Sequence, residues 1–256
     1  MLSIYHSAFN LIKHGFVGWE NSVKSSCRFA DEVVIAVNSS VDKTKEKIAE
    51  CLSEFSNWRI VDTDFSYQDP WLDGKIKNEA LQACTQDFKI QLDLDEYIPL
   101  WQKPLWQNLA MQIALSPVQC AAVASVNLYK DWNHYSSITN KQYFHKGQAY
   151  RAPSIRARKP DGSINTLMSD GCDLVNERGE FVSTTATSNS QADLESCAVP
   201  FVVHFGYVDL DSRLKRNHEF WHEHWYVEGG GQAPAHKIHM SYEDFEYPYV
   251  EHKLKL

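Results

Sequence analysis

The first 92 residues alternate apolar, β-branched runs with helix-like stretches, and this alternation restricts most strongly how the chain can fold. Four apolar runs predict strands, at residues 2–6, 32–37, 58–62 and 88–92. Three stretches between them have helical spacing, at residues 20–29, 43–55 and 73–84. Strands that alternate with helices in this way favour a mainly parallel sheet with right-handed crossovers. The pattern predicts an α/β protein.

The second half of the chain has a different character. A helix is expected near residues 104–116, a strand at 121–128, a late strand at 200–207 and a helix at 210–228. The segment from 129 to about 198 is rich in aromatic, Gly and Ser residues, which favours antiparallel strands and long loops. Residues 229–256 are expected to form a polar, aromatic extension.

Charge and hydropathy exclude several classes of protein. The formal net charge of −8 disfavours sequence-independent binding to nucleic acid or anionic lipid, which depends on an excess of Lys and Arg. No window contains the roughly 18 apolar residues that span a bilayer, and the first residues carry no basic, signal-like start. We expect a cytoplasmic protein with at most peripheral membrane contact.

An acidic triplet, Asp93-Leu94-Asp95, follows the predicted strand at 88–92. Ligands bind beyond the carboxyl ends of parallel strands, so the triplet is well placed for a site. In extended backbone, Asp93 and Asp95 would point the same way while Leu94 points into the protein. Two carboxylates suit Mg²⁺ or Mn²⁺, and such an ion can bridge the diphosphate of a nucleotide-sugar. The alternative is a solvated acidic turn.

Three further segments precede the triplet in a recognisable order. They are a polar loop after the first strand (YHS, 5–7), a segment after the second strand (VNSSVDKT, 37–44) and a basic helix (KIKNEAL, 75–81). Together with the triplet they resemble family 2 and related GT-A glycosyltransferases over residues 2–98. Asn38 stands where that family usually has an acid, and Lys75 and Lys77 replace its more usual Arg pattern.

The resemblance implies a fold and an activity. The fold would be a single GT-A-like domain, with a nucleotide-sugar-binding half at 1–100, an acceptor-binding half at 101–228 and the extension at 229–256. The activity would be hexosyl transfer from a UDP-, GDP- or dTDP-sugar to a hydroxyl of a glycan or lipid-linked glycan, with inversion and with Mn²⁺ or Mg²⁺ as cofactor.

The resemblance also implies particular site residues. The loop 6–8 and Asn38 would line the base and ribose, Lys75 would approach the diphosphate, and Asp93 would lie near the ribose or a metal-bound water. Asp95 would bind the metal directly. The complete set implied for the donor is His6, Ser7, Ala8, Asn38, Lys75, Asn78, Asp93 and Leu94.

Two functional groups are expected farther along the chain. His204, in the segment VVHFGY, resembles a third metal ligand beside Asp93 and Asp95, although a buried histidine at a strand end is an equal alternative. Inversion needs a carboxylate that accepts the proton of the acceptor hydroxyl. Asp173 is the first candidate for this base and Asp170 the second, with Glu177 behind them, and an Asp-Gly turn is the alternative.

Two other functions compete with the transferase. Residues 218–222 read HEFWH and match the HExxH pattern of zinc peptidases, with Glu243 or Glu246 as a further ligand, although an amphipathic helix also explains them. The other candidate is a carbohydrate or nucleotide-sugar binder without turnover, because several aromatic residues can stack on sugar rings. These residues are Trp71, Trp101, Trp106, Trp132, Tyr135, Tyr143 and Tyr150.

Overall fold

Strand β2 (Glu32–Asn38) is buried along its whole length, as its uninterrupted β-branched sequence predicts. Val33 and Ile35 point to one hydrophobic core, and Val34 and Ala36 point to a second core on the opposite face. The sheet that contains β2 is therefore covered on both sides. The computed structural model describes residues 1–66, 72–136, 140–151, 174–209, 211, 249–251 and 254–256.

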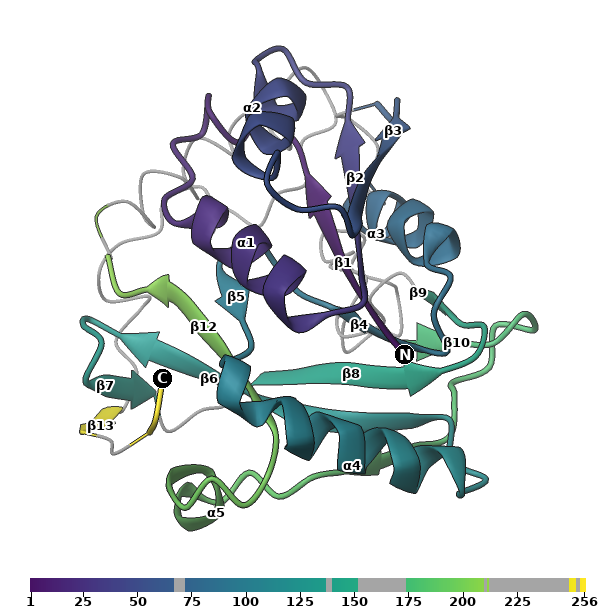
Figure 1. Ribbon diagram of the computed structural model, residues 1–256, viewed down its shortest axis with the longest axis vertical. Coiled ribbons are helices and arrows are strands. Elements are labelled where there is room, and N and C mark those ends of the chain that lie inside the picture. Colours follow the sequence, from purple (N-terminus) through teal and green to yellow (C-terminus); the bar gives the residue numbers. More distant parts are fainter. Residues whose placement is uncertain (67–71, 137–139, 152–173, 210, 212–248, 252–253) are drawn as a thin grey trace, which may run out of the picture.

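Four parallel strands form the first half of the sheet. Strands β1 (Leu2–Ala8), β3 (Trp58–Thr63) and β4 (Phe88–Gln91) join β2 in the order β3-β2-β1-β4. Helices α1 (Trp19–Phe29), α2 (Thr44–Cys51) and α3 (Leu72–Ala83) connect them (Figure 1). The predicted alternation is confirmed, and the carboxyl ends of β1, β2 and β4 meet at one edge of the sheet.

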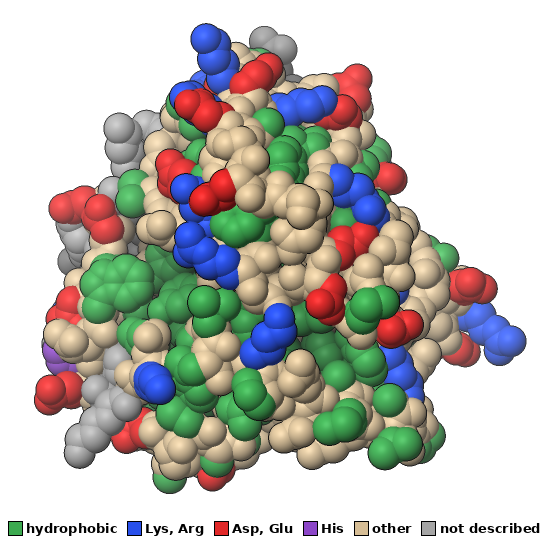
Figure 2. Space-filling model, viewed as in Figure 1, with side chains coloured by type: hydrophobic (Ala, Val, Ile, Leu, Met, Phe, Trp, Pro, Cys, Tyr) green, Lys and Arg blue, Asp and Glu red, His purple; other side chains and the backbone are tan. Residues whose placement is uncertain are grey.

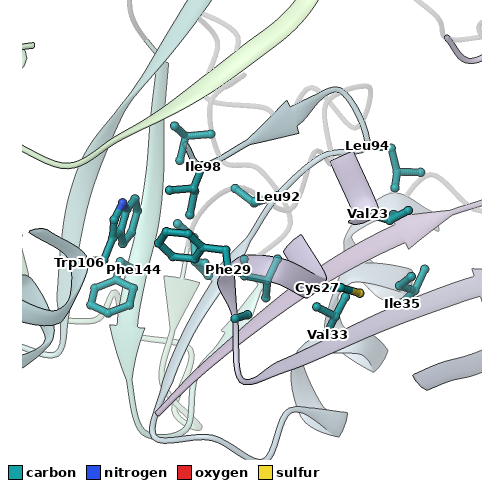
Figure 3. Close-up of a cluster of buried hydrophobic side chains, with 14 of the residues drawn as sticks. Val23, Cys27, Phe29, Val33, Ile35, Leu92, Leu94, Ile98, Trp106 and Phe144 are labelled. Atoms are coloured by element: carbon teal, nitrogen blue, oxygen red, sulfur yellow. The ribbon is translucent and has the colours of Figure 1, made fainter. Parts of the chain in front are cut away.

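Each face of the sheet has its own helices. Helices α1 and α4 (Lys103–Ala114) supply Val23, Cys27 and Trp106 to the core that also contains Ile35. In this core the Trp106 ring packs edge-to-face against Phe144, with ring centroids 5.4 Å apart (Figure 3). Helix α3 covers the other face. The core is thus divided into two layers by the parallel strands.

Antiparallel strands continue the sheet beyond β4. Strand β8 (Asn140–Lys146) pairs antiparallel with both β4 and β6 (Cys120–Tyr129). Strand β12 (Phe201–Tyr207) runs parallel to β6, and the short β5 (Glu96–Tyr97) pairs antiparallel with β12. The predicted fold class, α/β with a parallel centre and a smaller antiparallel part, is confirmed. This topology brings β12 beside the residues that follow the acidic triplet.

The remaining elements are short. They are β7 (His134–Ser136), β9 (Tyr150–Arg151), β10 (Leu174–Val175), β11 (Thr184–Ala186), β13 (Tyr249–Glu251), a 3₁₀ turn η1 (Leu100–Gln102) and α5 (Gln191–Glu195). Strand β13 pairs with β7, and Leu254 is buried in a further hydrophobic cluster with Phe201 and Val203 of β12. The expectation of a merely polar extension is therefore wrong for these residues, because the edge of β7 offers backbone hydrogen bonds. Within the described part of the chain, no helix has the length and apolarity to cross a membrane.

Candidate active site

The acidic triplet lies in a tight turn between β4 and β5. The amide N–H of Glu96 donates to the carbonyl of Asp93 at 3.0 Å, which closes the turn. The prediction of extended backbone, with Asp93 and Asp95 pointing the same way, is therefore wrong. Leu94 is buried in the core, as predicted, and lies near Val23 of α1 (Figure 3). The buried Leu94 anchors the turn, and the carboxylates of Asp93 and Asp95 project from it into different environments.

Asp95 is buried and faces His204 on β12. The Asp95 Oδ2 and His204 Nε2 atoms are 3.4 Å apart. The amide N–H of Phe205 donates to the Asp95 carbonyl at 2.9 Å, so main-chain bonding also fixes this approach. Sequence reasoning placed His204 near the triplet from a resemblance alone. The pairing of β5 with β12 supplies the physical reason for the contact.

The other ring nitrogen determines what His204 can do. Its Nδ1 lies 2.9 Å from the Oδ1 of Asn127, and because an amide oxygen only accepts, Nδ1 carries the proton. In the neutral ring, Nε2 then presents a lone pair to the Asp95 carboxylate. Two ligand atoms bound at about 2.1 Å to one cation can lie up to about 4.2 Å apart, so the separation fits a shared ion.

Asp93 is more exposed and meets a buried lysine. Its Oδ1 accepts a hydrogen bond from Gln91 Nε2 at 2.5 Å and lies 3.4 Å from Lys77 Nζ. Lys77 also binds Asp73, one helical turn earlier, at 2.8 Å. The expected lysine, Lys75, is exposed, and its Nζ lies 5.8 Å from the Phe65 ring centroid. Lys77 is therefore the lysine of α3 that meets the acidic turn, and the diphosphate contact expected of Lys75 stays a prediction.

Glu96 is a fully buried carboxyl that sequence reasoning missed. It accepts hydrogen bonds from Ser125 Oγ at 3.0 Å, from Gln142 Nε2 at 2.9 Å and from the Asp93 amide at 2.9 Å. Burial, with a contribution from the Asp93 charge, raises the pKa of Glu96 to about 7, although the nearby His204 lowers it. The Glu96 side chain therefore stabilises the turn by linking it to Ser125 of β6 and Gln142 of β8.

His6 and Asn38 are occupied inside the protein. The His6 ring nitrogens lie 2.8 Å from the Leu92 carbonyl and 3.0 Å from Ser26 Oγ, and burial lowers the pKa of His6 to about 4. The Asn38 amide donates to the Phe65 carbonyl and accepts from the Phe65 N–H. Both side chains therefore already have protein partners, and the expectation that these residues line a base and ribose stays a prediction.

The other predicted donor residues have varied surroundings. Ser7 Oγ lies 3.5 Å from Asp73 Oδ1, and Ala8 is buried. Asn78 donates to the Arg151 carbonyl at 3.0 Å and accepts from the Arg151 N–H at 2.6 Å, which ties α3 to β9. Asn78 therefore holds the main chain of β9 against α3.

Several predicted residues lie outside the described part of the chain, namely Asp170, Asp173, Glu243, Glu246, Trp71 and the HExxH segment 218–222. Glu177 is described and exposed, in a turn closed by a hydrogen bond from the Gly179 amide to the Asn176 carbonyl. Among the described residues, no group of three or more His, Cys, Asp and Glu side chains is arranged to hold a metal. Of the three residues predicted to bind a metal, the described structure brings Asp95 and His204 into direct contact.

Comparisons with known proteins give distant structural likenesses. No protein-family model matches the sequence, and no curated protein sequence matches it. TarS 1-349 from S. aureus is 13% identical with a TM-score of 0.47, over 92% of this chain and 68% of that chain. The same protein in complex with UDP-GlcNAc is 12% identical with a TM-score of 0.47, over 92% and 69%.

Glucosyl-3-phosphoglycerate synthase from Mycobacterium tuberculosis, in complex with Mn²⁺, UDP and phosphoglyceric acid, is 17% identical. Its TM-score is 0.32, over 51% of this chain and 43% of that chain. At these scores the likenesses transfer no function, which has to be argued from the side chains of this chain.

Proposed function

We propose that this protein is a metal-dependent glycosyltransferase that moves a sugar from a nucleoside-diphosphate donor to an acceptor hydroxyl. The observation that carries the proposal is the buried pair of Asp95 and His204, whose Oδ2 and Nε2 atoms are 3.4 Å apart beyond the carboxyl end of β4. That end of a parallel strand is where ligands bind in open α/β sheets. The family resemblance of the sequence supplies the substrate class.

The donor atoms of the pair fit a divalent cation. A carboxylate oxygen and a neutral imidazole nitrogen form a mixed set, which favours Mn²⁺ over Mg²⁺, since Mg²⁺ prefers oxygen ligands and retains several waters. Asp95 and His204 would hold the ion. When bound, the ion would neutralise the charge that develops on the departing nucleoside diphosphate.

Lys77 supplies a second positive group at the same site. Its side chain is 4% exposed, and its ammonium is held by Asp73 and Asp93. Within such a low-dielectric setting, a fixed cation interacts strongly with an approaching phosphate. We assign to Lys77 the diphosphate contact that the sequence suggested for Lys75, and we keep Asp93 near the ribose or a metal-bound water.

The rest of the reaction follows from the resemblance. Asp173, with Asp170 as the alternative, accepts the proton of the acceptor hydroxyl as that oxygen attacks the anomeric carbon, which inverts the configuration there. The donor is a UDP-, GDP- or dTDP-sugar, the acceptor is a glycan or lipid-linked glycan, and the setting is the cytoplasm.

A thermal-shift experiment tests this proposal. The melting temperature is measured with UDP, GDP and dTDP, each with and without Mn²⁺, because a ligand that binds only the folded state must raise it. We expect one nucleotide to raise the melting temperature only with Mn²⁺. Asp95→Asn and His204→Ala should both abolish the shift.

A second carboxylate–imidazole pair provides a matched control. Asp131 Oδ1 and His134 Nδ1 lie 2.9 Å apart at the turn between β6 and β7, and neither residue contributes to the Asp95 and His204 pair. Asp131→Asn and His134→Ala should leave the nucleotide shift intact. A shift that survives Asp95→Asn and His204→Ala would overturn the metal assignment, and the absence of any nucleotide shift in the wild type would overturn the function.

A further inference from the structure

A cavity of about 500 Å³ lies beside the acidic turn. Its walls come from the loop before α1, from one side of α1, from β5, from the turn after β6, and from the end of β12 with the residues that follow it. Figure 2 shows apolar side chains gathered on this face of the molecule, below α1 and over the end of β12 in the orientation of Figure 1. The volume is within the range of small-molecule sites.

Aromatic rings form one wall of the cavity. Trp132 stacks on Phe205 with ring centroids 6.0 Å apart and an interplanar angle of 24°. The Tyr97 ring is 6.1 Å from Phe205. Trp132 is 52% exposed even though Phe205 backs it, so the indole presents a broad apolar surface. A flat aromatic surface of this kind matches the C–H face of a pyranose ring.

Among the aromatic residues considered for sugar stacking, Trp132 alone lines this cavity within the described structure. Trp106 and Tyr135 are buried in hydrophobic cores. Trp101 packs against a core and donates its indole N–H to the Lys255 carbonyl at 2.8 Å. The structure therefore selects one stacking residue from the earlier set.

Polar side chains form the facing wall. Asn21, Ser25 and Arg28 follow one another at helical spacing on α1, and all three line the cavity. Asp209, two residues after β12, adds a carboxylate. A lipid chain would remove these groups from water without returning hydrogen bonds, which costs free energy. The hydroxyl groups of a sugar can bond to them.

The cavity shares its framework with the metal pair. Tyr97 lies two residues after Asp95, and Phe205 directly follows His204. The cavity-lining Ser22 hydroxyl donates to the Glu96 carbonyl at 2.5 Å, within the turn itself. Gly18 has a φ of +83° and packs closely against Phe205. A Cβ at this position would lie 2.7 Å from the Phe205 ring. The aromatic wall is thus fixed relative to the turn.

We propose that this cavity binds one sugar ring of the acceptor, with Trp132 as its stacking platform and the polar face of α1 as its hydrogen-bonding wall. The assignment of the sugar to the acceptor depends on the proposed transferase function. The binding of a sugar ring depends only on the cavity.

Fluorine NMR of protein labelled with 5-fluorotryptophan tests the sugar site directly. The Trp132 resonance is assigned with Trp132→Phe and followed during titration with methyl β-glucoside, N-acetylglucosamine, cellobiose and octanol. We expect at least one sugar to shift it saturably at millimolar concentration, while the Trp101 resonance stays in place. A response to octanol alone would overturn the proposal in favour of a lipid acceptor. If no compound shifted the Trp132 resonance, the proposal would also be overturned.

Variants that keep the fold refine the test, with the same titration followed by two-dimensional NMR of the backbone amides. Trp132→Ala should weaken sugar binding at least tenfold, and Asn21→Ala severalfold, because both side chains are at the surface of the cavity. Met111→Ala, an exposed change on α4 outside the cavity, should leave binding unchanged. Equal sugar affinity in Trp132→Ala and Met111→Ala would contradict the stacking role.

The nucleotide shift separates this inference from the proposed function. Trp132→Ala should retain the Mn²⁺-dependent nucleotide shift of the wild type. If nucleotides bind and no sugar does, the sugar site is wrong and the transferase proposal stands. If sugars bind and no nucleotide does, the sugar site stands and the transferase proposal is wrong.

Discussion

His6 and His204 both lie near the acidic turn, yet their ring nitrogens meet different partners. His6 is enclosed between the Leu92 carbonyl and the Ser26 hydroxyl. His204 presents Nε2 to the Asp95 carboxylate. A ring with both nitrogens occupied by the protein stabilises the fold, whereas a ring with one nitrogen directed at a buried carboxylate can share a cation with it. We therefore expect His6 to contribute to stability and His204 to contribute to metal binding.

His6→Gln tests the enclosed histidine through the pH dependence of stability. The folded-state pKa of His6 is lowered to about 4, so between pH 6.5 and 4 the unfolded chain binds more protons. The stabilisation is present above pH 6.5 and is lost as the pH falls to 4. Relative to His6→Gln, the wild type should lose about 3 kcal/mol of unfolding free energy from pH 7 to 4. Urea titrations measure this difference, which would be constant with pH if His6 were solvated.

Glu96→Ala tests the buried brace beneath the turn. The change leaves the donors of Ser125, Gln142 and the Asp93 amide without their acceptor, and each such loss in a buried site costs about 1–3 kcal/mol. We expect an unfolding free energy lower by about 3 kcal/mol in urea denaturation. Glu50→Ala, at a side chain that is 71% exposed, should change it by less than about 0.5 kcal/mol. Similar values for both variants would contradict the bracing role.

Helix α3 shows how far the sequence determines an element and where it stops. Its limits and its apolar face were predictable within a few residues, because Ile76, Ala80 and Leu81 follow helical spacing. The choice between Lys75 and Lys77 was not, because it depends on which side of α3 meets the turn after β4. The turn itself was mistaken for extended backbone, since two acids around one leucine fit either form.

Lys77→Met and Lys75→Met form a matched pair on α3. Lys77 lies 3.4 Å from Asp93, whereas Lys75 is exposed and near the Phe65 ring. We expect Lys77→Met to weaken Mn²⁺-dependent nucleotide binding at least tenfold, and Lys75→Met less than threefold. Isothermal titration gives both affinities, and thermal melting confirms that each variant is folded. The reverse order would restore Lys75 as the diphosphate contact.

At the scale of the whole molecule, the site depends on pairings between distant parts of the chain. His204 reaches Asp95 because β12 pairs with both β5 and β6. Local periodicity predicts that a strand exists but not which strand it joins, so the sequence implied this contact only through a resemblance. The same reason explains why the pairing of β13 with β7 was missed.

Leu254→Ala tests whether the last residues belong to the core. Leu254 is 8% exposed and joins a cluster that contains Phe201 and Val203 of β12. The loss of a buried leucine side chain should lower the unfolding free energy by about 2 kcal/mol or more. Leu115→Ala, at a side chain that is 91% exposed, should have an effect below about 0.5 kcal/mol. Urea denaturation of both variants checks this, and equal effects would place Leu254 outside the core.

Donor turnover with water as the acceptor tests whether this protein is a metal-dependent glycosyltransferase. UDP-, GDP- and dTDP-sugars are incubated with the protein and Mn²⁺, and the released nucleoside diphosphate is quantified by chromatography. The proposed transferase activity predicts release from one donor class, abolished by EDTA and by Asp95→Asn, and retained in Asp131→Asn. Release that persists in Asp95→Asn, or no release from any of the three donors, would contradict it.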